Sequence, residues 1–132
     1  MNREIKFRAK FIYHNEWLYG DLRHFQGNNV LICEYEGLGG YPVKPETVGQ
    51  FTGLLDNNGK EIYEGDIIQS FDSNGKPIRH IVEYERTEAK FVVILAERPK
   101  YDFGGDISQR WIKEFEKEVI GNIYDNPELL NK

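Results

Sequence analysis

The sequence holds few of the residues that build disulfide-bonded, thiolate-metal or membrane-spanning proteins. Cys33 is the one cysteine of the chain, which excludes an internal disulfide and a zinc site built on several thiolates. No apolar run approaches the roughly 20 residues that cross a bilayer. The charged start, Met-Asn-Arg-Glu-Ile-Lys, lacks the apolar core of a signal peptide. We therefore expect a cytoplasmic protein that does not enter a membrane.

The chain also has fewer basic than acidic residues. The chain has 17 Lys and Arg against 22 Asp and Glu, for a formal net charge of −5. Because phosphate contacts supply most of the affinity of non-specific duplex binding, this balance disfavours a general nucleic-acid binder, unless a local basic face overcomes it. The length of 132 residues is enough for one domain with its own core, and 39% hydrophobic residues beside 30% charged ones describe a soluble globular protein.

What the chain does have is turn residues between short runs of aromatic and β-branched residues. The clearest is Asn58-Gly59, a dipeptide that readily takes positive φ at both central positions of a primed hairpin turn. It joins predicted strands over residues 47–55 and 60–63. Glu64-Gly65-Asp66 forms a second sharp turn. This punctuation indicates antiparallel strands, and no crossover helix is available for a parallel sheet.

Other strands follow from periodicity. Apolar residues at positions 5, 7, 9, 11 and 13 alternate with basic residues at 6, 8 and 10. This pattern predicts a half-buried strand over residues 5–13, since successive side chains point to opposite faces. The run Val-Leu-Ile-Cys over residues 30–33 is typical of a strand buried on both faces. Further strands are predicted over residues 17–25, 67–71, 78–84 and 91–95. Residues 35–45 and 96–106 contain Gly and Pro and are expected to be loops.

Near the end of the chain the periodicity fits both a helix and a strand. We favour a short helix over residues 108–113 and then a strand through Tyr124. Asn126, a cap candidate, precedes Pro127, which predicts one terminal helical turn.

These elements predict a mainly β fold, a β-dominated α+β class of antiparallel strands. It would include a small SH3-like barrel in the C-terminal half and a short C-terminal helical turn. We expect a single domain over residues 1–132, with a subdivision into an N-terminal β-meander (1–59), the barrel (60–124) and a tail (125–132).

Two stretches identify a family. Residues 48–68 contain Val-Gly-Gln-Phe-Thr-Gly-Leu and then Asn-Gly-Lys-Glu-Ile-Tyr-Glu-Gly-Asp-Ile-Ile, and residues 119–129 read Val-Ile-Gly-Asn-Ile-Tyr-Asp-Asn-Pro-Glu-Leu. With Ile-Lys-Phe-Arg-Ala at 5–9 and Trp-Leu-Tyr-Gly at 17–20, the chain resembles, over nearly its whole length, the YopX family of small proteins from phages and prophages of Gram-positive bacteria. The resemblance implies a compact, mostly β protein encoded by mobile elements. The family's molecular function is uncharacterised, and it offers no catalytic residues to carry over.

Three patterns suggest chemistry, and each has a structural alternative that we favour. Glu64 and Asp66 offer carboxylates to a hard cation, but an Asp at a turn commonly accepts bonds from backbone amides. Cys33 with His14, His24 or His80 offers a thiol and a base, but a cysteine within an apolar run is usually a small buried hydrophobe. The glycines of residues 37–40 lack the lysine and helix of a phosphate-binding loop. We therefore predict no catalytic, cofactor-binding or metal-binding residue.

The first strand carries the most interesting surface. Lys6, Arg8 and Lys10 alternate along one face, and with Tyr101 and Phe103 of the second long loop they form the predicted binding surface. Small barrels bind single strands with a basic groove and aromatic platforms. The alternatives are an edge strand protected by charge, or pairing with an acidic row across strands or subunits. The candidate acidic row is Glu114, Glu116 and Glu118.

The first functional hypothesis is a non-enzymatic phage or prophage accessory protein. It would be a binding module in the cytoplasm of the bacterial host that acts on a host or phage protein, with a homo-oligomer as one form, no cofactor and no membrane contact. The alternative is a single-stranded nucleic-acid-binding module. A metal-assisted hydrolase ranks third.

Overall fold

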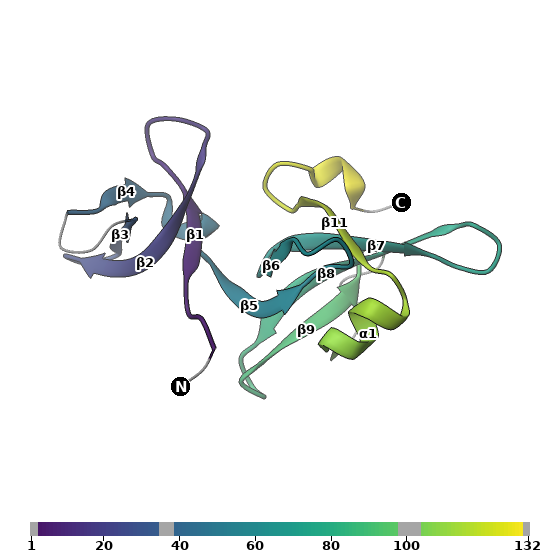
Figure 1. Cartoon of the computed structure of the whole chain (residues 1–132). Helices are drawn as coiled ribbons and strands as arrows, with labels where there is room; N and C mark the ends of the chain where they lie inside the picture. Colours follow the sequence, from purple (N-terminus) through teal and green to yellow (C-terminus); the bar gives the residue numbers. More distant parts are fainter. Residues whose placement is uncertain (1–2, 35–38, 98–103, 131–132) are drawn as a thin grey trace. The chain divides into compact units, whose positions relative to one another are not determined.

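The computed structural model describes residues 3–34, 39–97 and 104–130. The chain divides into two compact units, Met1–Gly53 and Leu54–Lys132, called the first and second unit below. Both are built from antiparallel strands (Figure 1), so the mainly β prediction is confirmed. The finer subdivision at residues 59 and 124 stays a prediction.

The first unit is one antiparallel sheet with an apolar core. Its strands are β1 (Phe7–Lys10), β2 (Trp17–Phe25), β3 (Asn29–Cys33), β4 (Tyr41–Val43) and the start of β5 (Gly49–Leu55), with a 3₁₀ turn, η1 (Pro45–Thr47), before β5. They lie in the order β4-β3-β2-β1-β5. The core residues are Ala9, Leu18, Val30, Ile32 and Val43. Strand β2 has the bounds that the sequence predicted.

Three expectations for the first unit are wrong. The strand predicted over residues 5–13 ends at Lys10, because the chain turns there and the Phe11 amide donates to the Glu16 carbonyl at 3.1 Å. Strand β4 lies within the predicted loop 35–45, since Val43 is drawn into the core. Strand β3 buries Val30 and Ile32 on one face alone, with its other residues half-buried or exposed.

The second unit is a twisted sheet with one helix. Its elements are β6 (Glu61–Tyr63), β7 (Asp66–Phe71), β8 (Pro77–Glu85), β9 (Lys90–Leu95), β10 (Gly105–Asp106), α1 (Gln109–Glu114), β11 (Glu118–Asn122) and a 3₁₀ turn, η3 (Pro127–Leu129). The sheet order β10-β9-β8-β7-β11 is open over the described residues, so closure into an SH3-like barrel stays a prediction. The short strand β10 corrects part of the loop predicted over 96–106.

The sheet of the second unit buries apolar side chains on both faces. Ile81 and Val82 are neighbours on β8 and so point to opposite faces. Val82 packs with Ile62, Ile68, Val93 and Ile112 of α1. Ile81 packs with Ile94 and Ala96, covered by Ile123 and Leu130 near the C-terminus.

The predicted helices are both present. Ser108 caps α1 by accepting a bond from the Trp111 amide at 3.1 Å, which satisfies one of the amides that a helix start leaves open. The terminal turn forms at Pro127–Leu129, although Asn126 Oδ1 accepts from the Asn122 amide at 3.2 Å instead of capping it. In the described part of the chain, neither α1 nor any other helix has the length and apolar character to cross a membrane.

The hairpin between β5 and β6 confirms the strand pairing but corrects the turn type. Gly59 has φ +86°, whereas Asn58 is not in the positive-φ region. Asp56 Oδ1 accepts from the amides of Asn58 and Lys60 at 2.8 and 2.9 Å. The aspartate therefore fixes a turn that needs one glycine rather than two residues with positive φ.

Candidate binding surface

The basic residues of β1 are less accessible than their alternation predicts. Arg8 is 6% exposed and Lys10 is 5% exposed. Trp17, opposite Lys10 in the β1–β2 register, covers both: its ring centroid lies 4.6 Å from Arg8 Cζ and 5.3 Å from Lys10 Nζ. Lys10 Nζ also donates to Asn15 Oδ1 at 2.7 Å. An exposed ladder is therefore wrong for Arg8 and Lys10, because cation–π contacts hold both side chains inside the unit.

Lys6 also lies near an aromatic ring, but it is only half-buried. Its Nζ lies 5.5 Å from the centre of the Phe51 ring and 3.5 Å from Glu4 Oε2. Tyr101 and Phe103, the remaining members of the predicted surface, lie outside the described residues. Whether these five residues bind a partner stays a prediction.

The structure also bears on the two structural explanations for the basic residues of β1, edge protection and pairing with an acidic row. Strand β1 pairs with β2 on one side and β5 on the other, so it is not an edge strand, and protection of an edge is the wrong explanation. The acidic residues do not share one strand: Glu114 ends α1, Glu116 lies in the following turn and Glu118 begins β11. Their pairing with the basic residues stays a prediction.

Beyond Lys10, the chain presents a group of aromatic rings. Phe11 is the centre of this group, with ring centroids at 5.4 Å from Tyr13, 5.6 Å from His14 and 6.0 Å from Tyr41. Tyr13 is 71% exposed, and Tyr41 and His14 are also exposed. We call Phe11, Tyr13, His14 and Tyr41 the aromatic surface. It is an accessible cluster on the first unit.

Backbone bonds fix the two segments that carry the aromatic surface. Phe11 forms an isolated bridge with Val43. The Ile12 amide donates to the Pro42 carbonyl at 3.1 Å, and the Lys44 amide donates to the Lys10 carbonyl at 2.8 Å. The contacts of Phe11 with Tyr13 and Tyr41 are edge-to-face, a favoured arrangement of aromatic pairs. The rings are thus held in place without a partner.

Sequence reasoning missed this surface. Strict alternation assigned Tyr13 to the core face, and Tyr41 fell within a predicted loop. The sequence His14-Asn15-Glu16 carried a signal, because such polar residues are typical of a turn and the alternation of a strand need not continue up to a turn. Nothing in the sequence placed Tyr41 beside Phe11, because that contact depends on the pairing of distant segments.

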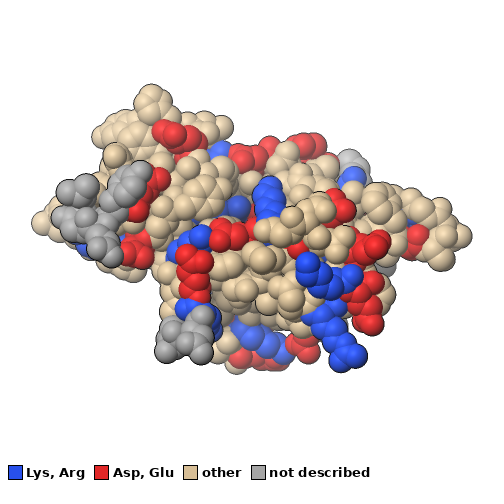
Figure 2. Space-filling view, in the orientation of Figure 1, with Lys and Arg blue, Asp and Glu red and all other residues tan. Residues whose placement is uncertain are grey.

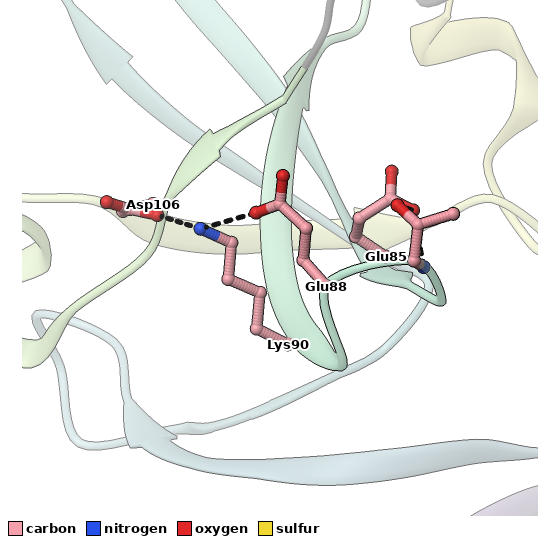
Figure 3. A network of polar contacts seen from close by, with 5 residues as sticks. Glu85, Glu88, Lys90 and Asp106 are labelled. Carbon is pink, nitrogen blue, oxygen red and sulfur yellow. Dashed lines mark hydrogen bonds and ion pairs between the residues drawn. The ribbon is translucent and has the colours of Figure 1, made fainter.

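An ion-pair network on the second unit links β9 to β10 (Figure 3). Lys90 Nζ lies 2.8 Å from Asp106 Oδ1 and 3.0 Å from Glu88 Oε1. The bond to Asp106 is the main cause that raises the pKa of Lys90 to about 12, and it lowers the pKa of Asp106. These groups are solvated, so the network is a surface brace between strands rather than a site that moves protons.

A serine and a lysine meet inside the second unit. Lys117 Nζ donates to Ser70 Oγ at 2.6 Å and lies 4.6 Å from the centre of the Trp111 ring. Burial lowers the pKa of Lys117. A lysine beside a serine can activate a nucleophile, but Ser70 is 5% exposed and Lys117 is 3% exposed, so a substrate has no access to the hydroxyl. The pair is part of the interior.

The structure also places the other residues whose side chains could carry chemistry. Asp66 Oδ2 accepts a bond from the Tyr63 amide at 2.7 Å, which is the structural alternative to a cation site at this turn. Cys33 is half-buried on β3. Within residues 3–34, 39–97 and 104–130, no three His, Cys, Asp or Glu side chains gather in a way that could hold a metal ion.

Comparison with known proteins decides the family. The family model described as YopX protein matches residues 6–131. The chain belongs to the YopX family. Among solved structures, this YopX-family chain is similar to protein EF1440 from Enterococcus faecalis, with 25% sequence identity, a TM-score of 0.67 and coverage of 98% of this chain and 99% of that one. Among curated proteins, none matches it. Family and fold are thereby shown.

Proposed function

We propose that this YopX-family chain is a non-enzymatic binding protein whose partner is another protein. The observation that supports the proposal is the aromatic surface of the first unit, centred on Phe11 and exposing Tyr13 and Tyr41. Tyrosine is enriched at protein interfaces, because one rigid ring supplies a large contact area and its hydroxyl tolerates water. Such residues carry much of the binding energy where they dominate an interface.

The charges around this surface favour a protein over a nucleic acid. The neighbouring Arg8 and Lys10 are buried against Trp17, where they are poorly placed to reach phosphates, which require accessible cations. On the face drawn in Figure 2, basic and acidic side chains are interspersed, and neither sign forms a continuous field. Exposed rings without a basic groove fit an apolar protein surface better than a nucleic-acid strand.

The fixed backbone of the aromatic surface also supports binding. Bonds between residues 10–12 and 42–44 hold both ring-bearing segments. A site that is already ordered loses less conformational freedom when a partner arrives, which leaves more of the contact energy for affinity.

The proposal extends to the setting that the family resemblance implies. The chain acts as a phage or prophage accessory protein in the cytoplasm of a bacterial host, on a host or phage protein. A homo-oligomer and closure of the second unit into an SH3-like barrel belong to the same proposal. Each is separable from the binding role and is tested apart from it.

A selection from random peptides tests the proposed function. Peptides enriched on the wild-type chain are measured for Kd against Tyr13→Ser and Tyr41→Ser variants. Loss of an interface hot spot is expected to weaken binding about tenfold or more. The control is Tyr84→Ser, which removes an exposed tyrosine that contacts Phe91 in the second unit. Enriched peptides that bind all three variants as tightly as the wild type would contradict the proposal.

A further inference from the structure

A hollow on the second unit exposes two phenylalanines. It is lined by Gln69, Phe71, Phe115, Glu116, Glu118 and Ile120 and has a volume of about 140 Å³. Phe71 is 63% exposed and Phe115 is 53% exposed. We call these six residues the phenylalanine hollow. Adjacent exposed apolar side chains with a polar rim are typical of interaction sites on soluble proteins.

Two neighbouring strands and the turn after α1 build this hollow. Glu118 of β11 lies opposite Gln69 of β7, so their side chains share one face of the sheet. Phe71 lies two residues beyond Gln69 and points to the same face. Phe115 and Glu116 come from the turn between α1 and β11. The ring positions are therefore set by the sheet and by the end of the helix.

The charged residues that line the hollow are both acidic. Glu116 and Glu118 are exposed on its lining, and none of its six residues is basic. The neighbouring cation Arg79 is held by Gln69, whose Oε1 accepts from Arg79 Nε at 2.9 Å. Two exposed phenylalanine rings beside two exposed carboxylates complement a segment with an apolar side chain beside a positive charge.

The backbone of Glu116 adds support. This residue has φ +53°, at the position after α1 where a glycine is usual. The Glu116 amide donates to the Lys113 carbonyl at 3.3 Å, and the Lys117 amide donates to the Ile112 carbonyl at 2.9 Å. These two bonds form a Schellman motif. A side chain at such a position strains the backbone, and here it places a carboxylate beside the phenylalanines.

We propose that the phenylalanine hollow docks a segment of a partner protein that carries an apolar side chain next to lysine or arginine. This goes beyond the proposed function, because it concerns different residues in the other unit and a partner of defined charge. The aromatic surface of the first unit has no carboxylate among its members, so the two surfaces select different chemistry.

Two synthetic peptides of equal length and apolar content test the hollow. One carries lysines at alternate positions and the other carries glutamates. Backbone amide shifts of the full-length chain are followed by NMR during each titration. We expect the lysine peptide to shift amides of residues 69–71 and 115–120, and the glutamate peptide to leave them unmoved. Equal responses to both peptides, or shifts outside these residues, overturn the proposal.

Glu116→Gly separates binding from folding. Removing the side chain relieves the backbone, so its Tm is expected to rise, while the Kd for the lysine peptide increases about threefold to fivefold with the loss of one exposed charge pair. The matched control is Ala89→Gly, which also replaces a residue of positive φ (55°) in the second unit but lies outside the hollow. It raises Tm without changing Kd. An unchanged Kd in Glu116→Gly overturns the proposal.

A second copy of the chain is the competing occupant. If it fills the hollow, the amides of residues 69–71 and 115–120 shift with protein concentration in the absence of peptide, which also overturns the proposal. Signals from residues 11–14 and 41 report on the aromatic surface separately. Failure of the hollow is thus distinguishable from failure of the proposed function.

Discussion

The two units bury positive charge in the same way. In the first, Lys10 lies over Trp17 and donates to Asn15. In the second, Lys117 lies over Trp111 and donates to Ser70. Each lysine lies over a tryptophan face and donates to a neutral side-chain oxygen, contacts that offset part of the cost of removing water from the ammonium group. The presence of a lysine in this sequence therefore does not by itself predict an exposed positive charge.

The units differ in what surrounds their exposed rings. The aromatic surface of the first unit consists of rings alone, whereas the phenylalanine hollow of the second is flanked by Glu116 and Glu118. Charge at the edge of an apolar site contributes specificity and rate of encounter. The difference predicts that charge selects the partner of the second unit, whereas apolar contact selects the partner of the first.

Removal of Trp17 is expected to cause the largest loss of stability. Trp17→Ala takes away the ring that covers Arg8 and Lys10, so the free energy of unfolding falls by about 3 kcal/mol or more. Trp17→Phe keeps an aromatic face and loses less. Urea unfolding measures both variants. Equal losses in the two would show that the ring does not hold the cations.

Lys117 offers a test by pH. Its folded pKa lies below the unfolded value of about 10.4, so the unfolded chain binds more protons between these values and stability rises as the pH passes upward through them. Lys117→Met keeps the stem over Trp111 and is expected to be more stable at neutral pH by about 1 kcal/mol. This difference shrinks toward pH ~10.

Thermal unfolding from neutral to alkaline pH measures the difference between Lys117→Met and the wild type. Lys113→Met, which removes a lysine from an exposed position of α1, serves as the matched control for the loss of one lysine. A difference that stays constant with pH would contradict the burial of a charged Lys117.

Substitution within the aromatic surface is expected to leave the fold almost unchanged. Tyr13→Ser alters an exposed side chain in the connection between β1 and β2, so the free energy of unfolding changes by about 0.5 kcal/mol or less. Calorimetry measures this change, and the peptide Kd measures function in the same samples. A loss of several kcal/mol would make Tyr13 a structural residue and weaken its assignment to binding.

The smallest effect is expected at the surface ion pair. Because the folded pKa of Asp106 is lowered by Lys90, its contribution to stability is present above the unfolded pKa and is lost as the pH falls through the folded one. Asp106→Asn lowers Tm slightly at neutral pH and low salt. The difference disappears at about 1 M salt, where charges on a surface are screened. Persistence at high salt would indicate a role other than pairing with Lys90.

Local signals predicted much of the fold. The bounds of β2 and a short helix beginning near Ser108 were both predicted from the local sequence. Local signals did not predict which side chains are buried. The motifs Asp56–Lys60 and Asp72–Lys76 share the same side-chain and backbone turn bonds, yet Asp56 is buried and also accepts from the Val119 amide at 2.9 Å. That bond depends on a distant strand, which the local sequence does not reveal.

The candidate sites were harder to predict for the same reason. Alternation placed Arg8 and Lys10 on one face correctly, but it could not show that Trp17 lies against that face. The aromatic surface depends on the pairing of Phe11 with Val43, and the phenylalanine hollow on the pairing of β7 with β11. Contacts between distant segments decide which side chains remain accessible.

Site-specific photo-crosslinking in bacterial cells that express the chain tests the binding role of the aromatic surface most directly. A photoreactive phenylalanine analogue replaces Tyr13 in one strain, Tyr41 in another and Tyr84 in the control. We predict that light produces one discrete adduct with the same protein from positions 13 and 41, and none from position 84. No adduct, an adduct with nucleic acid, or the same adduct from position 84 would contradict the proposed function.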